Sequence, residues 1–176
     1  MKALIKAILR ILLYPWRRLR ASRDGVMDVA PRREYPNDAL LTYVGQKIAE
    51  GHDATIYVKG YSMRPFLEHE RDKVVLTPVK EPLRIADAVL AEINPGHFVL
   101  HRIIEINGEE ITLMGDGNIC STEHCTVKEI RGVVTHYIRP KRTLLASDEQ
   151  LRKNIRRWRK LLPIRRYLLL IYRATV

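Results

Sequence analysis

Three short segments of the sequence carry the side chains that serine hydrolases use. Ser62 stands in GYSMRPFL, His101 in FVLHRII and Asp116 in MGDGN. A serine hydroxyl becomes a good nucleophile beside a general base, and imidazole accepts and returns a proton near neutral pH. A carboxylate then fixes the imidazole tautomer and stabilises the imidazolium that forms. Together the three residues suit covalent acyl transfer.

Taken singly, each segment has an ordinary structural explanation. A serine beside a glycine is common in turns, and so is an aspartate between glycines. By strand alternation His101 shares its face with Val99 and Ile103, which is typical of a histidine in a core. The chemical interpretation therefore depends on the three segments occurring together.

The pattern around these segments predicts one helix followed by short strands. The helix covers residues 37–50 and ends at Gly51. Apolar runs predict strands over residues 55–59, 73–77, 88–93, 98–106, 110–114 and 132–138. Asn107-Gly108 between two such runs predicts a hairpin. The chain is therefore expected to be mainly β (α+β), with a small twisted or coiled sheet.

The types and order of these motifs resemble the signal peptidase I family, whose peptidase fold is shared by the self-cleaving LexA-type repressors. The matching segments are GYSMRPFL, VLHRII, MGDGN and IRGVV, all within residues 58–138. The resemblance implies a coiled β-sheet peptidase domain, with Ser62 as nucleophile, His101 as general base and Asp116 as the third member. Histidine in the place of the usual lysine is similar to the endoplasmic-reticulum and archaeal members.

The resemblance also implies a reaction and a substrate class. It implies a serine endopeptidase without cofactor or metal, acting on an extended signal or leader peptide added along a sheet edge. The amide of Ser62 would donate to the oxyanion, and Gly60 would allow close backbone approach. Endoplasmic-reticulum-type members carry a second acidic residue, and here the neighbourhood offers Glu123. Its role stays open, outside the predicted catalytic set.

The formal net charge of +11 is unevenly distributed along the chain. Residues 1–33 carry +7 and residues 141–176 carry +9, whereas residues 34–140 carry −5. We therefore expect a basic N-terminal arm, a peptidase domain over residues 34–140, and a basic C-terminal arm.

Both arms are apolar as well as basic. Cations recur among leucines and isoleucines over residues 1–22, and residues 148–173 contain a stripe formed by Leu151, Ile155, Trp158 and Leu162. Such helices suit an anionic membrane surface, so we expect a membrane-associated protein, peripheral or monotopic. Nucleic acid is not expected, because no helix-turn-helix or zinc-finger spacing is present. For the N-terminal arm, a cleavable signal peptide and a helix docked on the domain are the alternatives.

Cys120 and Cys125 enclose a short polar segment that includes His124. Their spacing fits no standard zinc pattern, and we expect two free thiols. A Cys120–Cys125 disulfide and a metal site are the alternatives.

Two other functions are compatible with the sequence. A catalytically inactive membrane-surface binding module of the same fold would hold Ser62 and His101 too far apart to hydrogen-bond. A self-cleaving LexA-type regulator would need a DNA-binding region, and residues 1–50 offer one convincing globular helix.

Overall fold

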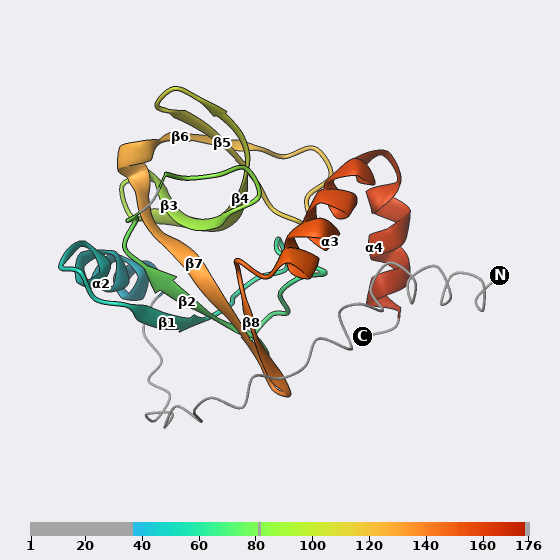
Figure 1. The fold of residues 1–176 in the computed structure, drawn as a ribbon, viewed down its shortest axis with the longest axis horizontal. Coiled ribbons are helices and arrows are strands. Elements are labelled where there is room, and N and C mark those ends of the chain that lie inside the picture. The colour runs from blue at the N-terminus through green and yellow to red at the C-terminus, as the bar shows by residue number, and fades with distance from the viewer. Residues whose placement is uncertain (1–36, 81, 175–176) are drawn as a thin grey trace.

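A computed structural model of the chain describes residues 37–80 and 82–174 (Figure 1). The predicted N-terminal arm, residues 1–33 with the amphipathic segment 1–22, lies outside the described residues.

The described residues form one antiparallel eight-stranded sheet, which confirms the mainly β class. The strands are β1 (Ala54–Tyr57), β2 (Lys73–Thr77), β3 (Ala88–Asn94), β4 (His97–Asn107), β5 (Glu110–Met114), β6 (Glu123–Thr126), β7 (Ile130–Arg139) and β8 (Arg142–Leu145). Their order is β1-β2-β7-β3-β4-β5-β6, and β8 pairs with β7. Each predicted strand is present. The four-residue strands β6 and β8 are not predicted, because segments so short carry too little alternation to be recognised.

Two adjacent hairpins build the part of the sheet that contains His101. The predicted hairpin is confirmed, because Asn107 pairs with Glu110 and joins β4 to β5. Gly108 in its turn has a φ of +61°, which glycine adopts without steric cost. β4 also pairs with β3, so it lies between two partners.

Helices cover the sheet and close a large hydrophobic core. Helix α2 (Asn37–Ala49) confirms the predicted helix and buries Leu41, Val44 and Ile48. A short 3-10 turn, η1 (Val127–Glu129), joins β6 to β7. A second, smaller core between β3, β4 and β5 includes Val89, Ile103 and Leu113.

The C-terminal segment, which the charge pattern sets apart as a basic arm over residues 141–176, contributes a strand and helices to the same fold as far as residue 174. β8 joins the sheet, and α3 (Glu149–Lys160), η2 (Leu162–Ile164) and α4 (Arg165–Arg173) follow it. The stripe that we expected to face a membrane packs against the domain. The buried core residues that these helices supply are Leu151, Ile155, Trp158, Leu168 and Leu169. An apolar stripe on a helix does not reveal whether a lipid surface or a sheet will cover it.

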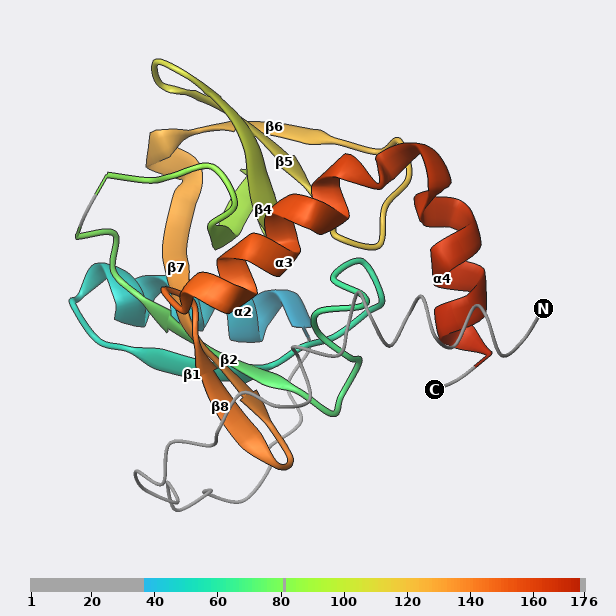
Figure 2. The same ribbon diagram turned by 45° about the vertical axis from the view of Figure 1, so that its right-hand side comes forward.

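The two C-terminal helices run along one side of the domain. Asp148 caps α3, its carboxylate accepting from the amide of Leu151 at 2.7 Å. α4 then leaves at a steep angle to α3 (Figure 2). Leu162, the last residue of the predicted stripe, does not follow the other three into the core: it is exposed, because α3 ends at Lys160 and Leu162 lies in η2.

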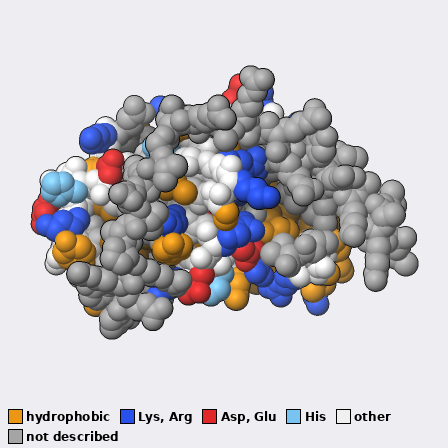
Figure 3. All heavy atoms as spheres, turned by 90° about the horizontal axis from the view of Figure 1, so that it is seen from below, with side chains coloured by type: hydrophobic (Ala, Val, Ile, Leu, Met, Phe, Trp, Pro, Cys, Tyr) orange, Lys and Arg blue, Asp and Glu red, His pale blue; other side chains and the backbone are white. Residues whose placement is uncertain are grey.

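None of the described helices has the length and apolar character needed to span a membrane. In the view from below, Lys and Arg side chains lie among hydrophobic ones on the described surface (Figure 3).

Candidate active site

Ser62 lies in the loop that follows β1, at the edge of the sheet. Gly60 has a φ of +86°, a conformation that favours glycine, and its amide donates to Nδ1 of His69 at 3.1 Å. The residues after the serine anchor the loop in the large core; they are Met63, Phe66 and Leu67, each no more than 2% exposed. Ser62 itself is half-buried. The Ser62 side chain therefore projects from a loop whose neighbouring residues are anchored in the core.

The glycine-rich turn after β5 packs directly against this loop. The amide of Gly117 donates to the carbonyl oxygen of Ser62 at 2.6 Å. A Cβ on Gly115 would lie 2.5 Å from that same oxygen, and one on Gly117 would lie 2.8 Å from the Tyr61 carbonyl oxygen. Both approaches are closer than a side chain permits, so the two backbones meet only because glycines stand there.

His101 lies on β4 and is 5% exposed. Its Nδ1 atom is 2.7 Å from Oε2 of Glu123, the first residue of β6. An ionised carboxylate can only accept a hydrogen bond, so beside it a neutral imidazole carries its proton on Nδ1 and keeps the lone pair on Nε2. This tautomer is the one that a general base needs.

Asp116 has a different partner from the predicted one. Its two carboxylate oxygens accept from the guanidinium of Arg102, with Nε at 2.9 and 3.0 Å and Nη2 at 2.5 Å. Successive side chains of a strand point to opposite faces, so His101 and Arg102 cannot both reach this carboxylate. The carboxylate that contacts His101 in the structure is therefore Glu123, which lies outside the predicted catalytic set.

The Arg102–Asp116 pair is almost completely buried, at 1% and 3% exposure. Arg102 also donates to the carbonyl oxygen of Ala86 at 2.9 Å. Burial acts to lower the pKa of Arg102, but the Asp116 carboxylate and the Tyr137 phenol outweigh it and the pKa is raised. The guanidinium stays charged and ties the glycine-rich turn to the sheet.

The strand register and the Ser62 loop place Ser62 and His101 next to the same glycine, Gly115. The ladder between β4 and β5 ends with Arg102 opposite Met114, so the next residue of β4, His101, lies beside Gly115. A Cβ on Gly115 would be 3.0 Å from the Cβ of Ser62. The structure therefore brings the predicted nucleophile and base to one turn.

The hydroxyl and amide of Ser62 are not used by the rest of the described chain. Within residues 37–80 and 82–174, no hydrogen bond joins the hydroxyl to His101, and the amide donates to no other group. The part of the chain that the structure describes therefore leaves the Ser62 amide, the predicted oxyanion donor, without an acceptor. Serine–base hydrogen bonds are often long before substrate binds.

Two residues of the C-terminal helices hold the glycine-rich turn. The indole Nε1 of Trp158 donates to the carbonyl oxygen of Asp116 at 2.7 Å, and its ring packs edge-on against Phe66. Arg165 donates from Nη1 to the carbonyl oxygen of Asn118 at 2.8 Å. The sequence contains no signal that Trp158 and Arg165 bind the glycine-rich turn, because its pattern indicates only that both belong to basic amphipathic segments.

The C-terminal helices make a third contact, from Tyr172 on α4 to the loop of Ser62. The phenol of Tyr172 donates to Oε2 of Glu68 at 3.0 Å, and Nε of Arg64 donates to Oε1 of Glu68 at 2.8 Å. The amide of Glu68 donates in turn to Oδ2 of Asp72 at 2.9 Å. The loop between β1 and β2 is therefore braced by α4 as well as by the core.

The structure shows no clustered metal ligands in the part of the chain that it describes, where no three His, Cys, Asp or Glu side chains converge. Cys120 and Cys125 are both free thiols, so the alternative of a disulfide between them is wrong. Cys120 is exposed and Cys125 is buried against the small core.

Comparisons of the chain with protein-family models, curated proteins and solved structures found no match.

Proposed function

We propose that the protein is a serine endopeptidase with a signal-peptidase-like fold, in which Ser62 is the nucleophile, His101 the general base and Glu123 the group that orients it. The observation that carries this proposal is the partly buried His101–Glu123 pair beside the turn that Ser62 contacts. A carboxylate on Nδ1 leaves Nε2 as the proton acceptor, which is the arrangement of a serine–histidine–acid triad.

The reaction follows from these positions. The hydroxyl oxygen of Ser62 attacks the carbonyl carbon of the scissile bond while Nε2 of His101 takes the hydroxyl proton. The amide of Ser62 donates to the oxygen that becomes negative. The C–N bond breaks, the proton passes from Nε2 to the leaving amine, and an acyl ester on Ser62 remains. Water, deprotonated by the same imidazole, hydrolyses the ester and restores the serine.

The sheet supports a peptide substrate in an extended conformation. Among the described strands β1 is an edge, paired with β2 alone, and the loop of Ser62 follows it directly. A peptide that adds to this edge forms main-chain hydrogen bonds and brings its own carbonyl groups toward Ser62. Signal or leader peptides are the substrate class that we propose, on the basis of the motif resemblance.

The test is cleavage of signal-peptide-bearing precursors by the purified full chain, with products identified by mass spectrometry. Ser62→Ala and His101→Ala should each abolish cleavage. The matched controls are Ser121→Ala and His124→Ala, because both side chains are exposed and lie in the same region. These controls should cleave normally. Cleavage that persists in purified Ser62→Ala would overturn the proposal.

A catalytically inactive binding module is the second candidate. It is favoured by the lack of a Ser62–His101 hydrogen bond among the described residues. It predicts that the wild-type chain cleaves none of the precursors but still binds them, and that Ser62→Ala binds them equally well.

A further inference from the structure

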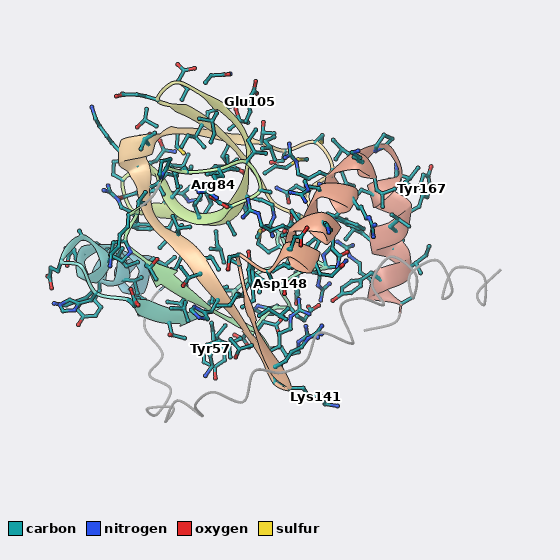
Figure 4. All side chains as sticks on the ribbon, in the orientation of Figure 1. Tyr57, Arg84, Glu105, Lys141, Asp148 and Tyr167 are labelled. Atoms are coloured by element: carbon teal, nitrogen blue, oxygen red, sulfur yellow. The ribbon has the colours of Figure 1, made fainter. Side chains whose placement is uncertain are left out.

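Helix α4 has two faces with different roles. Its inner face is buried in the domain through Arg165, Leu168, Leu169 and Tyr172. Its outer side exposes two large residues, Tyr167 at 62% and Leu170 at 55%. Figure 4 shows Tyr167 on the side of α4 that faces away from the sheet. Large apolar side chains that lie together on a surface, as in this strip, are typical of a site that contacts another molecule or a membrane.

The strip continues into η2 and is flanked by cations. Leu162 and Ile164 in η2 are 37% and 47% exposed. At 100° per residue, Arg166 and Arg173 project along one border of the strip, and both are exposed. We call these six residues the α4 outer face: Leu162, Ile164, Arg166, Tyr167, Leu170 and Arg173.

The exposed charges of η2, of α4 and of the adjoining end of α3 are all positive. Neither η2 nor α4 contains an acidic residue. The one acidic residue within α3, Glu149, pairs with Lys153 at 2.7 Å in its first turns. Exposed cations at the other end of α3, among them Arg157 and Lys160, extend the positive surface toward η2.

We infer that the α4 outer face docks the protein on an anionic lipid surface. Leucine and isoleucine enter the acyl boundary, tyrosine lies at headgroup level, and arginines bind the lipid phosphates. Phosphate contacts alone, as on a nucleic acid, would not need an exposed strip of large apolar residues. The surface differs from the stripe that the sequence suggested: the domain covers Leu151, Ile155 and Trp158, whereas Leu162 is exposed and belongs to the α4 outer face.

Docking at this face has a consequence for the candidate site. The inner face of the same helix holds Asn118 through Arg165 and Glu68 through Tyr172. The loop of Ser62 would therefore be held at a fixed place relative to the lipid surface. The docking inference itself does not depend on peptidase activity.

The test is sedimentation of the full chain with vesicles of phosphatidylglycerol and phosphatidylcholine, compared with vesicles of phosphatidylcholine alone. Tyr167→Ser/Leu170→Ser should weaken binding to the anionic vesicles by about tenfold or more. Arg166→Ser/Arg173→Ser should weaken it by roughly fivefold per cation at low salt, and by less as salt rises.

Each variant has a matched control. Tyr43→Ser/Leu145→Ser removes a tyrosine and a leucine that are 56% and 52% exposed elsewhere on the domain. Lys128→Ser/Lys141→Ser removes two exposed cations at other sites; Lys141 lies at the tip of the β7–β8 hairpin (Figure 4). Both controls should bind anionic vesicles nearly as well as the wild-type chain.

Three results would overturn the inference. The first is a wild-type chain that does not bind anionic vesicles. The second is full binding by both α4 variants, which would assign lipid binding to residues 1–22. The third is a loss of duplex DNA binding in these variants while vesicle binding is unchanged.

Discussion

The Nδ1 atom of His101 lies 2.7 Å from Oε2 of Glu123, across β5, the strand between β4 and β6. This contact decides which carboxylate can orient the imidazole. Asp116, the nearer choice from the motif, is fully engaged by Arg102. The two acidic residues therefore have separate partners: Glu123 contacts His101, whereas Asp116 binds Arg102 and ties the glycine-rich turn to the sheet.

Replacing Glu123 should impair catalysis far more than stability. Glu123→Gln keeps the shape of the side chain but removes the charge that fixes the tautomer of His101. We expect kcat for peptide cleavage to fall by about 10²–10⁴-fold with little change in melting temperature. Glu110→Gln, an exposed carboxylate on the neighbouring strand β5, is the control. Undiminished kcat in Glu123→Gln would show that Glu123 does not act on His101.

Breaking the Arg102–Asp116 pair should mainly reduce stability. Arg102→Met leaves the Asp116 carboxylate buried without its partner, and we expect the free energy of unfolding to fall by about 3–5 kcal/mol. Arg102→Met/Asp116→Leu removes both charges and should recover part of that loss. Urea denaturation measures both variants. A single variant that loses less than about 1 kcal/mol would contradict the assigned role.

Trp158 should link the C-terminal helices to the candidate site. Trp158→Phe keeps an aromatic ring against Phe66 but removes the donor to the Asp116 carbonyl oxygen. The loss should be about 1–3 kcal/mol in unfolding free energy, together with reduced cleavage activity because the turn shifts. Tyr43→Phe, at an exposed ring, is the control. If Trp158→Phe retains full stability and activity, the helices do not hold the turn.

The two cysteines should differ sharply in reactivity. Burial raises the pKa of the Cys125 thiol to about 11, whereas Cys120 is exposed. In the folded protein at pH 8, iodoacetamide should modify Cys120 rapidly and Cys125 slowly, since the thiolate is the reactive form. The thiolate fraction of Cys125 should rise about tenfold per pH unit until the pH approaches that pKa. Cys120→Ser should remove the rapid phase; its persistence would place Cys125 at the surface.

The fold class could be predicted from the sequence because its signals are local. Alternation identified β1, β2, β3, β4, β5 and β7, and Asn107-Gly108 identified a hairpin. The sequence could not predict which surface covers the C-terminal stripe. Leu151 and Ile155 give the same pattern whether they pack on a sheet or on a lipid surface.

The candidate site was predictable in part for a related reason. The motifs named Ser62 and His101, and the backbone brings both beside Gly115. The choice between Asp116 and Glu123 depends on strand alternation and on the pairing of β5 with β6, which places Glu123 opposite Leu113. That pairing involves a four-residue strand with no sequence signal of its own.

The most direct test of the proposed activity is covalent labelling of Ser62 by a fluorophosphonate, which reacts with serine hydroxyls activated by a neighbouring base. Intact-mass and peptide mass spectrometry of the full chain should show one adduct, on Ser62. The adduct should be absent in Ser62→Ala, absent in His101→Ala and present in His124→Ala. A wild-type chain that stays unlabelled, or that is labelled equally when His101 is replaced, would contradict the assignment of Ser62 and His101 as nucleophile and base.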